Sequence, residues 1–271
     1  MTNQLIHRQS AIITYWMCAE KYRRRYANEE FRSPCARMIR GSGVHGGAAH
    51  NFRQKKDSHQ DLKKQDIVDK AVAVFDEIYE NEGCTLAPEE KSRGKGIVIG
   101  EERDRVWRLS ELQADDLAPT IQPVAVEQTI IADFPSLGFK VRGTLDLKDS
   151  RNVIQDLKSS TKKRPAADVH KDFQLTTYAA LDFTLTKKMP AGLKLNVLVD
   201  KKRPELQILE TARDMQDFET WFRTIKAVDA AIRAGIFPPT NKHNWWCSPK
   251  WCEYWADCIY WSESERSRIS A

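Results

Sequence analysis

Residues 143–178 read GTLDLKDSRNVIQDLKSSTKKRPAADVHKDFQLTTY, and this segment determines the predicted architecture of the chain. Its first half alternates apolar and polar residues and breaks at the turn residues Asp149 and Ser150, which is typical of two consecutive strands. A basic loop and a helical stretch follow. Side chains at positions i and i+2 of a strand point to the same face, so Asp156 and Lys158 should lie side by side.

A second carboxylate is expected to face this pair. Asp146 lies on the adjoining strand, four residues before Ser150, and in a hairpin of this length it falls nearly opposite Asp156. Two carboxylates at such a distance repel each other unless a cation lies between them, and oxygen ligands suit Mg²⁺ or Mn²⁺. A neighbouring lysine can orient or deprotonate a water molecule. The pattern indicates a metal-dependent phosphodiester-cleaving site, although charged residues on a half-buried sheet would give a similar pattern.

The remainder of the chain predicts helices packed on a mixed sheet. Hydrophobic periodicity predicts helices at 8–26, 60–82, 101–113, 170–186 and 214–234, and strands at 123–134, 139–149, 152–160, 193–200 and 205–210. Residues 27–43 are expected to be irregular and to lead through the glycine-rich RGSGVHGGAAH into a helix, with His45 at its start. The order of elements predicts an α/β fold with a central mixed β-sheet flanked by helices. We expect one domain over residues 1–262 and a flexible tail over 263–271.

Composition favours a protein with a phosphate-bearing partner in a reducing compartment. The chain has 271 residues, 30% of them charged, and a net charge of +5 with basic clusters at 21–26, 158–164 and 201–203. Such clusters suit nucleic acid, although any one of them can simply be a solvated face. No apolar run approaches the ~20 residues that span a bilayer, and the first residues do not resemble a signal peptide. We therefore expect a cytoplasmic location, no membrane partner and reduced cysteines.

The helix after the basic loop carries a further pair of polar residues. Gln174 and Tyr178 are spaced i and i+4, so their side chains are neighbours on one face of the helix. Both side chains can form hydrogen bonds to a phosphate or a base.

Taken in order, these motifs resemble the RecB-like branch of the PD-(D/E)XK nuclease superfamily. The set consists of His45 after the glycine-rich run, G-x-x-D at 143–146, D-x-K at 156–158 and Q-x-x-x-Y at 174–178. The resemblance covers roughly residues 8–260. Two positions depart from the superfamily's name: Leu145 replaces the proline before the first aspartate, and Asp156 stands where many members have glutamate.

The resemblance implies a restriction-endonuclease-like core and assigns roles to the motif residues. The divalent metal, Mg²⁺ or Mn²⁺, would be bound by His45, Asp146, Asp156 and the carbonyl of Leu157. Asp146, Asp156 and Lys158 would form the catalytic set, with Lys158 assisting the attacking water. Gln174 and Tyr178 would help to place the substrate strand. For Glu127, on the preceding strand, a structural role is preferred over that of a helper.

Three cysteines lie within twelve residues of one another near the C-terminus. A cytoplasmic protein rarely groups thiols for disulfides, so Cys247, Cys252 and Cys258 indicate a metal or cluster site. Two candidates for a fourth ligand remain open. His243 would complete a local zinc site, and Cys18 would bring the two ends of the chain together around an iron–sulfur cluster.

The family resemblance favours the second candidate. Some RecB-like nucleases, including CRISPR-associated and recombination-repair members, have one cysteine in the first helical segment and three near the C-terminus. By this resemblance Cys18, Cys247, Cys252 and Cys258 would bind a cluster, 4Fe–4S in type, with zinc as the alternative. The C-x4-C spacing at 247–252 is longer than the usual C-x2-C of that subset. Cys35 and Cys84 have no partner in the pattern and are expected to be free.

The resulting hypothesis is a metal-dependent DNA exonuclease. It would act on single strands or duplex ends in recombination, repair or phage DNA metabolism, with recombination proteins as candidate partners. A CRISPR-adaptation nuclease of the same fold is one alternative. A non-catalytic, zinc-containing nucleic-acid-binding module is the other, and it predicts a colourless protein that cleaves no DNA with any divalent metal.

Overall fold

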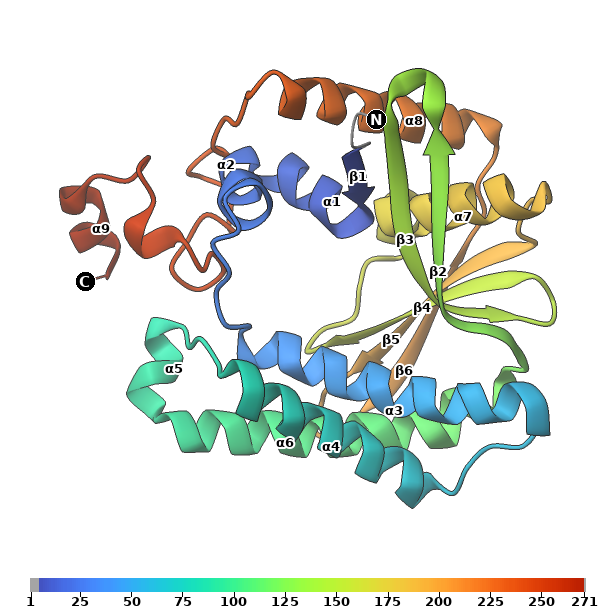
Figure 1. The fold of residues 1–271 in the computed structure, drawn as a ribbon. Helices are drawn as coiled ribbons and strands as arrows, with labels where there is room; N and C mark the ends of the chain where they lie inside the picture. Colours follow the sequence, from blue (N-terminus) through green and yellow to red (C-terminus); the bar gives the residue numbers. More distant parts are fainter. Residues whose placement is uncertain (1–4, 271) are drawn as a thin grey trace.

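A six-stranded mixed sheet forms the centre of the protein in the computed structural model, which describes residues 5–270 (Figure 1). The strands are β1 (Leu5–Arg8), β2 (Pro123–Phe134), β3 (Phe139–Asp149), β4 (Val153–Ser160), β5 (Gly192–Val199) and β6 (Glu205–Thr211). Their order is β1-β3-β4-β5-β6, and β2 also pairs with β3. The pairs β1–β3 and β4–β5 are parallel and the others are antiparallel. The predicted mixed sheet is confirmed.

Helices cover both faces of this sheet. They are α1 (Gln9–Met17), α2 (Ala19–Tyr22), α3 (Ala36–Ser58), α4 (Lys64–Glu82), α5 (Pro88–Arg93), α6 (Lys95–Leu112), α7 (Phe173–Thr186), α8 (Met215–Arg233) and α9 (Glu263–Ser270). On one face α3, α4 and α6 enclose a core with sheet residues such as Leu157, and on the other α1, α7 and α8 enclose a core with residues such as Leu145. The predicted fold class, a mixed sheet flanked by helices, is confirmed. Between residues 5 and 270, no helix is long and apolar enough to cross a membrane.

The glycine-rich run lies inside α3, which corrects the sequence prediction of an irregular segment leading into a helix at His45. Each glycine costs about 1 kcal/mol in an isolated helix, but three of them lie against α4. A Cβ atom built on Gly43 would lie 2.9 Å from the carbonyl oxygen of Ala71, and one on Gly47 would lie 2.7 Å from both Ala71 Cβ and the Ile67 carbonyl oxygen. The glycines therefore allow the two helices to pack with their backbones close together.

The C-terminal end of the described chain is helical. Residues 263–271 were expected to form a flexible tail, and α9 occupies Glu263–Ser270. Lys242 Nζ lies 2.9 Å from a carboxylate oxygen of Glu265, which connects this helix to the preceding loop. The flexibility of the segment, and the single domain over 1–262, remain predictions.

A matched pair of substitutions in α3 tests the role of its glycines. Gly47→Ala should destabilise the protein by about 1–3 kcal/mol, because the added methyl group overlaps backbone and side-chain atoms of α4. Gly41→Ala should stabilise it by about 0.5–1 kcal/mol, because a Cβ at Gly41 meets nothing within 4 Å and alanine is the better helix former. Urea unfolding of both variants measures the difference, and equal effects would contradict the packing role.

Candidate active site

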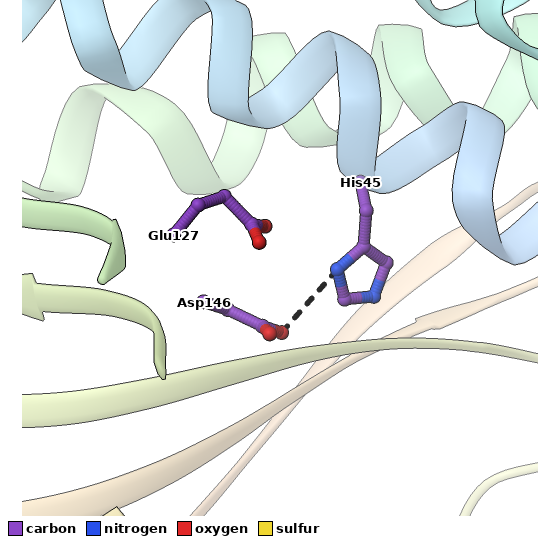
Figure 2. Close-up of side chains that lie close together, drawn as sticks. All are labelled: His45, Glu127 and Asp146. Carbon is purple, nitrogen blue, oxygen red and sulfur yellow. Dashed lines mark ion pairs between the residues drawn. The ribbon is translucent and has the colours of Figure 1, made fainter. Parts of the chain in front are cut away.

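Three side chains converge where α3 lies above β2 and β3. A ring nitrogen of His45 and carboxylate oxygens of Glu127 and Asp146 lie within 4.8 Å of one another (Figure 2). Among residues 5–270, this is the single group of three or more His, Cys, Asp or Glu side chains with that spacing. His45 comes from α3, and the two carboxylates come from neighbouring strands.

The strands present these carboxylates through two local irregularities. Glu127 has a φ of 48°, in the left-handed region that non-glycine residues rarely adopt, and it lies between the paired residues Val126 and Gln128 of β2. Such a conformation costs on the order of 1–3 kcal/mol and is found most often at functional sites. The β3–β4 ladder ends at Leu147–Gln155, one pair before Asp146 and Asp156 would face each other. The two strands separate at the point where the carboxylates project.

The contacts of His45 and Asp146 leave a place for a positive charge. His45 Nε2 donates to the carbonyl oxygen of Leu157 at 2.7 Å, so this nitrogen carries a proton. His45 Nδ1 then faces Asp146 Oδ2 at 3.3 Å. A lone pair and a carboxylate oxygen repel each other, unless a second imidazole proton or a metal cation lies between them. Imidazole nitrogen with two carboxylates is a ligand set that suits Mn²⁺ and, through the oxygens, Mg²⁺.

Glu127, for which the sequence favoured a structural role, lies within this group of closely spaced ligand atoms. Burial raises the pKa of its carboxyl group, and the nearby charge of Asp146 raises it further. Both effects are the cost of placing two carboxylates together in a half-buried site, and a bound cation would remove that cost. Val126 pairs with Leu147 and Gln128 pairs with Leu145, so Glu127 falls opposite Asp146. Pairing the two predicted strands in this register would therefore place Glu127 beside Asp146 from the sequence. The left-handed backbone that turns its side chain to the site has no sequence signal.

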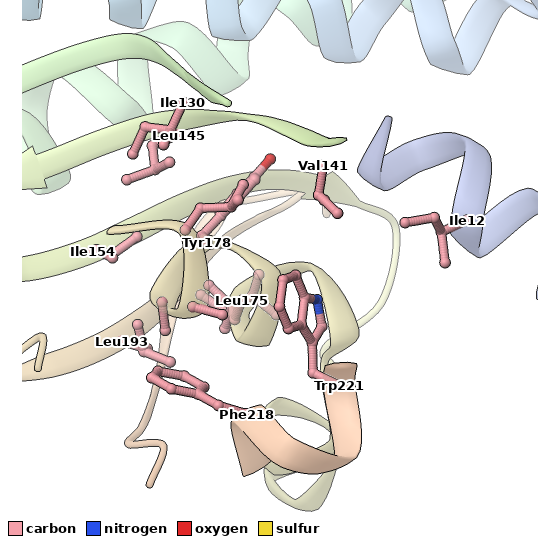
Figure 3. Close-up of a cluster of buried hydrophobic side chains, with 14 of the residues drawn as sticks. Ile12, Ile130, Val141, Leu145, Ile154, Leu175, Tyr178, Leu193, Phe218 and Trp221 are labelled. Atoms are coloured by element: carbon pink, nitrogen blue, oxygen red, sulfur yellow. The ribbon is translucent and has the colours of Figure 1, made fainter. Parts of the chain in front are cut away.

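A second group of polar side chains lies on the side of the sheet covered by α7. It consists of Asp156, Lys158, Gln174 and Tyr178. Lys158 Nζ lies 2.7 Å from Asp156 Oδ2 and donates a hydrogen bond to Asp156 Oδ1 at 3.0 Å. It also donates to Gln174 Oε1 at 3.0 Å. Gln174 Nε2 donates to Tyr178 Oη at 2.6 Å. Tyr178 is buried in the hydrophobic cluster between the sheet and α7, as Figure 3 shows. Its hydroxyl group therefore acts through Gln174.

Burial controls the charges of this second group. Burial raises the pKa of Asp156 to about 7; the adjacent Lys158 ammonium opposes this shift and the charge of Asp146 adds to it. Burial alone would lower the pKa of Lys158, but Asp156 and Asp146 together outweigh it and the net pKa is raised. Lys158 is consequently an ammonium group at neutral pH, suited to stabilising negative charge rather than to removing a proton.

The peptide unit of Leu157 joins the two groups. Its N–H donates to Asp146 Oδ2 at 3.0 Å, and its carbonyl accepts the proton of His45. The structure thus brings together His45, Asp146 and Leu157 of the expected metal ligands. Asp156 lies behind them, fully buried and paired with Lys158, and is not within the group of closely spaced ligand atoms.

A comparison of the sequence with protein-family models decides the classification. The model of the PD-(D/E)XK nuclease superfamily matches residues 9–259. The chain belongs to the PD-(D/E)XK nuclease superfamily. This membership supports a nuclease with a nucleic-acid substrate, and nucleases of this fold generally use divalent metal ions, for which the His45, Glu127 and Asp146 group is the candidate site.

One solved structure supports the fold. The crystal structure of a provisionally assigned exonuclease from Eubacterium rectale is 9% identical, with a TM-score of 0.57, and the match covers 93% of this chain and 87% of the other. The structure of the protein SSO0001 is 11% identical over 96% of this chain and 88% of its own, with a TM-score of 0.45, which is too low to support a conclusion. A search of curated proteins gives no match to the chain.

The four cysteines expected to act together in this PD-(D/E)XK protein line one cavity. Cys18, Cys247, Cys252 and Cys258 surround a space of about 280 Å³, to which His243 does not contribute. Burial raises the pKa of Cys252 to about 11, so this thiol is not a reactive thiolate in the absence of a bound cation. No three of the described cysteine sulfur atoms lie within 4.8 Å of one another.

The basic cluster at 21–26 has internal partners, which corrects its interpretation as a phosphate-binding or solvated surface. Lys21 and Arg25 lie 2.7 Å and 3.1 Å from the carboxylate of Glu253, and Arg24 forms a two-point contact with Asp257 at 2.7 Å and 3.0 Å. These ion pairs join the first helices to the cysteine-rich C-terminal segment. No local sequence pattern predicts these ion pairs, because the partners are more than 225 residues apart.

The Glu127 side chain should contribute directly to cation binding. Glu127→Gln removes one of two closely spaced carboxylates and should weaken Mn²⁺ binding by about tenfold or more, since even outer-shell partners of metal ligands contribute 10- to 100-fold. Titration calorimetry with MnCl₂ measures the change. Glu219→Gln, at an exposed position of α8, is the control and should bind Mn²⁺ like the unaltered protein. Unchanged binding in Glu127→Gln would assign Glu127 a structural role.

Proposed function

We propose that the chain is a divalent-metal-dependent DNA exonuclease that also carries an iron–sulfur cluster. The observation that supports it best is the close approach of His45 Nδ1 to Asp146 Oδ2, with the Glu127 carboxylate in the same group. The Lys158 ammonium group lies on the adjoining strand, paired with Asp156. This arrangement combines a cation site with a fixed positive charge. Both features are what hydrolysis of a phosphodiester requires, since negative charge increases on the phosphate oxygens in the transition state.

One set of residues would bind the cation, and Lys158 would stabilise charge on the phosphate. A divalent cation, when bound, lowers the pKa of a water molecule and polarises the phosphate. His45, Glu127 and Asp146 would hold it, with the Leu157 carbonyl alongside. Lys158, held by Asp156 and Gln174, offers its ammonium group to the charge that develops on the phosphate.

Several parts of the proposal rest on resemblance. The exonuclease activity is the provisional assignment of the Eubacterium rectale protein, and it agrees with the RecB-like order of motifs. A role in recombination, repair or phage DNA metabolism follows from the same resemblance, and a cytoplasmic location is a further part of the proposal. The choice of DNA ends or single strands is part of this proposal.

The cysteine cavity fits an iron–sulfur cluster better than a single zinc ion. Zinc bound by four thiolates holds the sulfur atoms about 3.8 Å apart, given a Zn–S distance near 2.3 Å and tetrahedral geometry. No three of the described cysteine sulfur atoms lie within 4.8 Å of one another, and cysteine is the usual ligand of iron–sulfur clusters. Cys18 and the three C-terminal cysteines would hold the cluster. This fit also disfavours the non-catalytic zinc-containing module.

Substitution of the site residues should abolish metal-dependent cleavage. Asp146→Asn and Lys158→Ala should each lower the rate on linear single-stranded DNA with Mg²⁺ or Mn²⁺ by at least about a hundredfold. Asp133→Asn and Lys140→Ala are matched controls, because these residues form an exposed ion pair on the same sheet, 3.1 Å apart. Unchanged cleavage in the site variants would refute the assignment. Rapid cutting of circular single strands would instead indicate an endonuclease.

Anaerobic purification should give a brown protein that absorbs in the visible range. Cys18→Ser should remove the colour and lower the thermal unfolding midpoint, because the cluster would join the two ends of the chain. Cys84→Ser is the control, since Cys84 does not line the cavity, and it should leave both properties unchanged. A colourless protein with stoichiometric zinc would refute the cluster.

A further inference from the structure

Three of the four exposed tryptophans of the described chain lie near its two ends and have no assigned role. Trp16, Trp245 and Trp251 have 60%, 62% and 42% of their surface exposed. Tryptophan is highly buried on average, because its large ring is costly to expose to water. Neighbouring exposed apolar groups mark surfaces that bind a partner.

Ring contacts join the C-terminal tryptophans, and a hydrogen bond to the backbone after Trp16 connects them to that residue. The indole nitrogen of Trp246 donates to the carbonyl oxygen of Met17, the residue after Trp16, at 3.1 Å. The Trp245 ring lies edge-on to Trp246 and to Trp251, with ring centroids 5.5 Å and 5.1 Å apart. We call Trp16, Trp246, Trp245 and Trp251 the aromatic path.

One end of the aromatic path reaches α7. The Trp16 ring packs edge-on against Phe173, with ring centroids 5.2 Å apart. Phe173 is the first residue of α7 and precedes Gln174, which contacts Lys158. Lys171, two residues before Phe173, is exposed and has no carboxylate partner among the ion pairs of residues 5–270.

The other end of the path reaches α3 and a basic side chain of that helix. The Arg37 guanidinium lies 4.5 Å from the centre of the Trp251 ring. Arg37 stands eight residues before His45 on α3, about two helical turns away. Lys250, adjacent to Trp251, is partly exposed and lies 3.2 Å from a carboxylate oxygen of Glu89, and Arg37 lies 3.4 Å from one of Glu90. The path therefore connects the two helices that carry His45 and Gln174.

We propose that the aromatic path binds an unpaired nucleic-acid strand by stacking its bases on the exposed rings. The inference rests on the proposed function, because it takes the substrate to be a nucleic acid. Base stacking needs aromatic faces and tolerates any sequence, while the phosphates need a cation, and Lys171 supplies one that has no carboxylate partner among the described residues. Arg37 and Lys250 would exchange their contacts with Glu90 and Glu89 for contacts with phosphate. Duplex DNA hides its base faces within the helix, so only an unpaired strand or a frayed end can use the path. The strand would pass from the cysteine-rich segment to Gln174 and Lys158.

Binding of an oligonucleotide without cleavage tests the path directly. The probe is a fluorescein-labelled 20-nucleotide oligodeoxythymidylate in EDTA, with anisotropy as the readout. The double variant Trp16→Ala/Trp245→Ala should bind it about tenfold or more weakly, since each stacked base contributes at least several-fold. Trp16→Phe/Trp245→Phe retains aromatic faces and should restore most of the affinity. Trp107→Ala, at a 37% exposed position of α6, is the control and should bind normally.

A test on the unaltered protein avoids any effect of substitution on folding. An abasic 20-mer has the same phosphates but no bases, so it should bind about as weakly as the oligodeoxythymidylate binds to the double alanine variant. Equal binding of the abasic and normal strands would overturn the proposal. Equal binding of the normal strand by all variants would also overturn it, and would leave the path to another occupant such as a protein.

Hydrolysis of a small ester separates the path from the catalytic proposal. Thymidine 5′-(p-nitrophenyl phosphate) occupies only the catalytic centre, so the double alanine variant should cleave it normally with Mn²⁺ and lose about tenfold in kcat/KM on the 20-mer alone. A parallel loss on the ester would overturn the path as a separate surface. If the unaltered protein cleaves neither substrate, the proposed function fails, and the binding measurements still decide the path.

Discussion

The peptide unit of Leu157 is the point on which the geometry of the site depends. Its N–H group fixes the Asp146 carboxylate, and its carbonyl group fixes the His45 ring. The residues on either side, Asp156 and Lys158, point to the other face of the strand, where α7 meets them. One strand segment therefore sets the positions of both groups of functional side chains. A displacement of β4 relative to α3 would disturb the possible cation site and the lysine together.

Glycines allow close packing of the helices on both sides of the sheet. On the α7 side, a Cβ at Gly143 would lie 2.7 Å from Leu181 Cδ1 and 3.5 Å from the Tyr178 ring, so the residue that opens the G-x-x-D motif is needed for close packing. On the other side, Gly43 and Gly47 bring α3 against α4. The site lies between two helices, α3 and α7. Each packs so closely on its neighbour that a residue larger than glycine would not fit at the contact. This packing explains why a helix with several glycines is tolerated despite its low intrinsic propensity.

The sequence revealed those features whose signal is local. The period-two alternation around Asp146 and Asp156 predicted the hairpin, and the spacing of Gln174 and Tyr178 predicted one helix face. Other features depend on tertiary contacts. The helical state of the glycine-rich run is set by α4, and local propensity argues against it. The left-handed backbone of Glu127 is imposed by the sheet around it.

The C-terminal segment shows why a bound group would matter to the fold as well as to function. The described residues between α8 and α9 contain one element of regular structure, a short 3-10 turn at Trp255–Asp257. It is held to the first helices by ion pairs of Glu253 and Asp257, the latter half-exposed. An exposed ion pair contributes about 1 kcal/mol or less, whereas fixing the backbone of one residue costs about 1–2 kcal/mol. Ion pairs alone are therefore a weak means of ordering such a segment, and buried Tyr254, Trp255 and Trp261 supply apolar contacts beside them.

A cluster bound by Cys18 and the three C-terminal cysteines would add ligand bonds between the same two segments. The exposed tryptophans between these cysteines and α7 would then be held in fixed positions, which a surface that stacks bases requires.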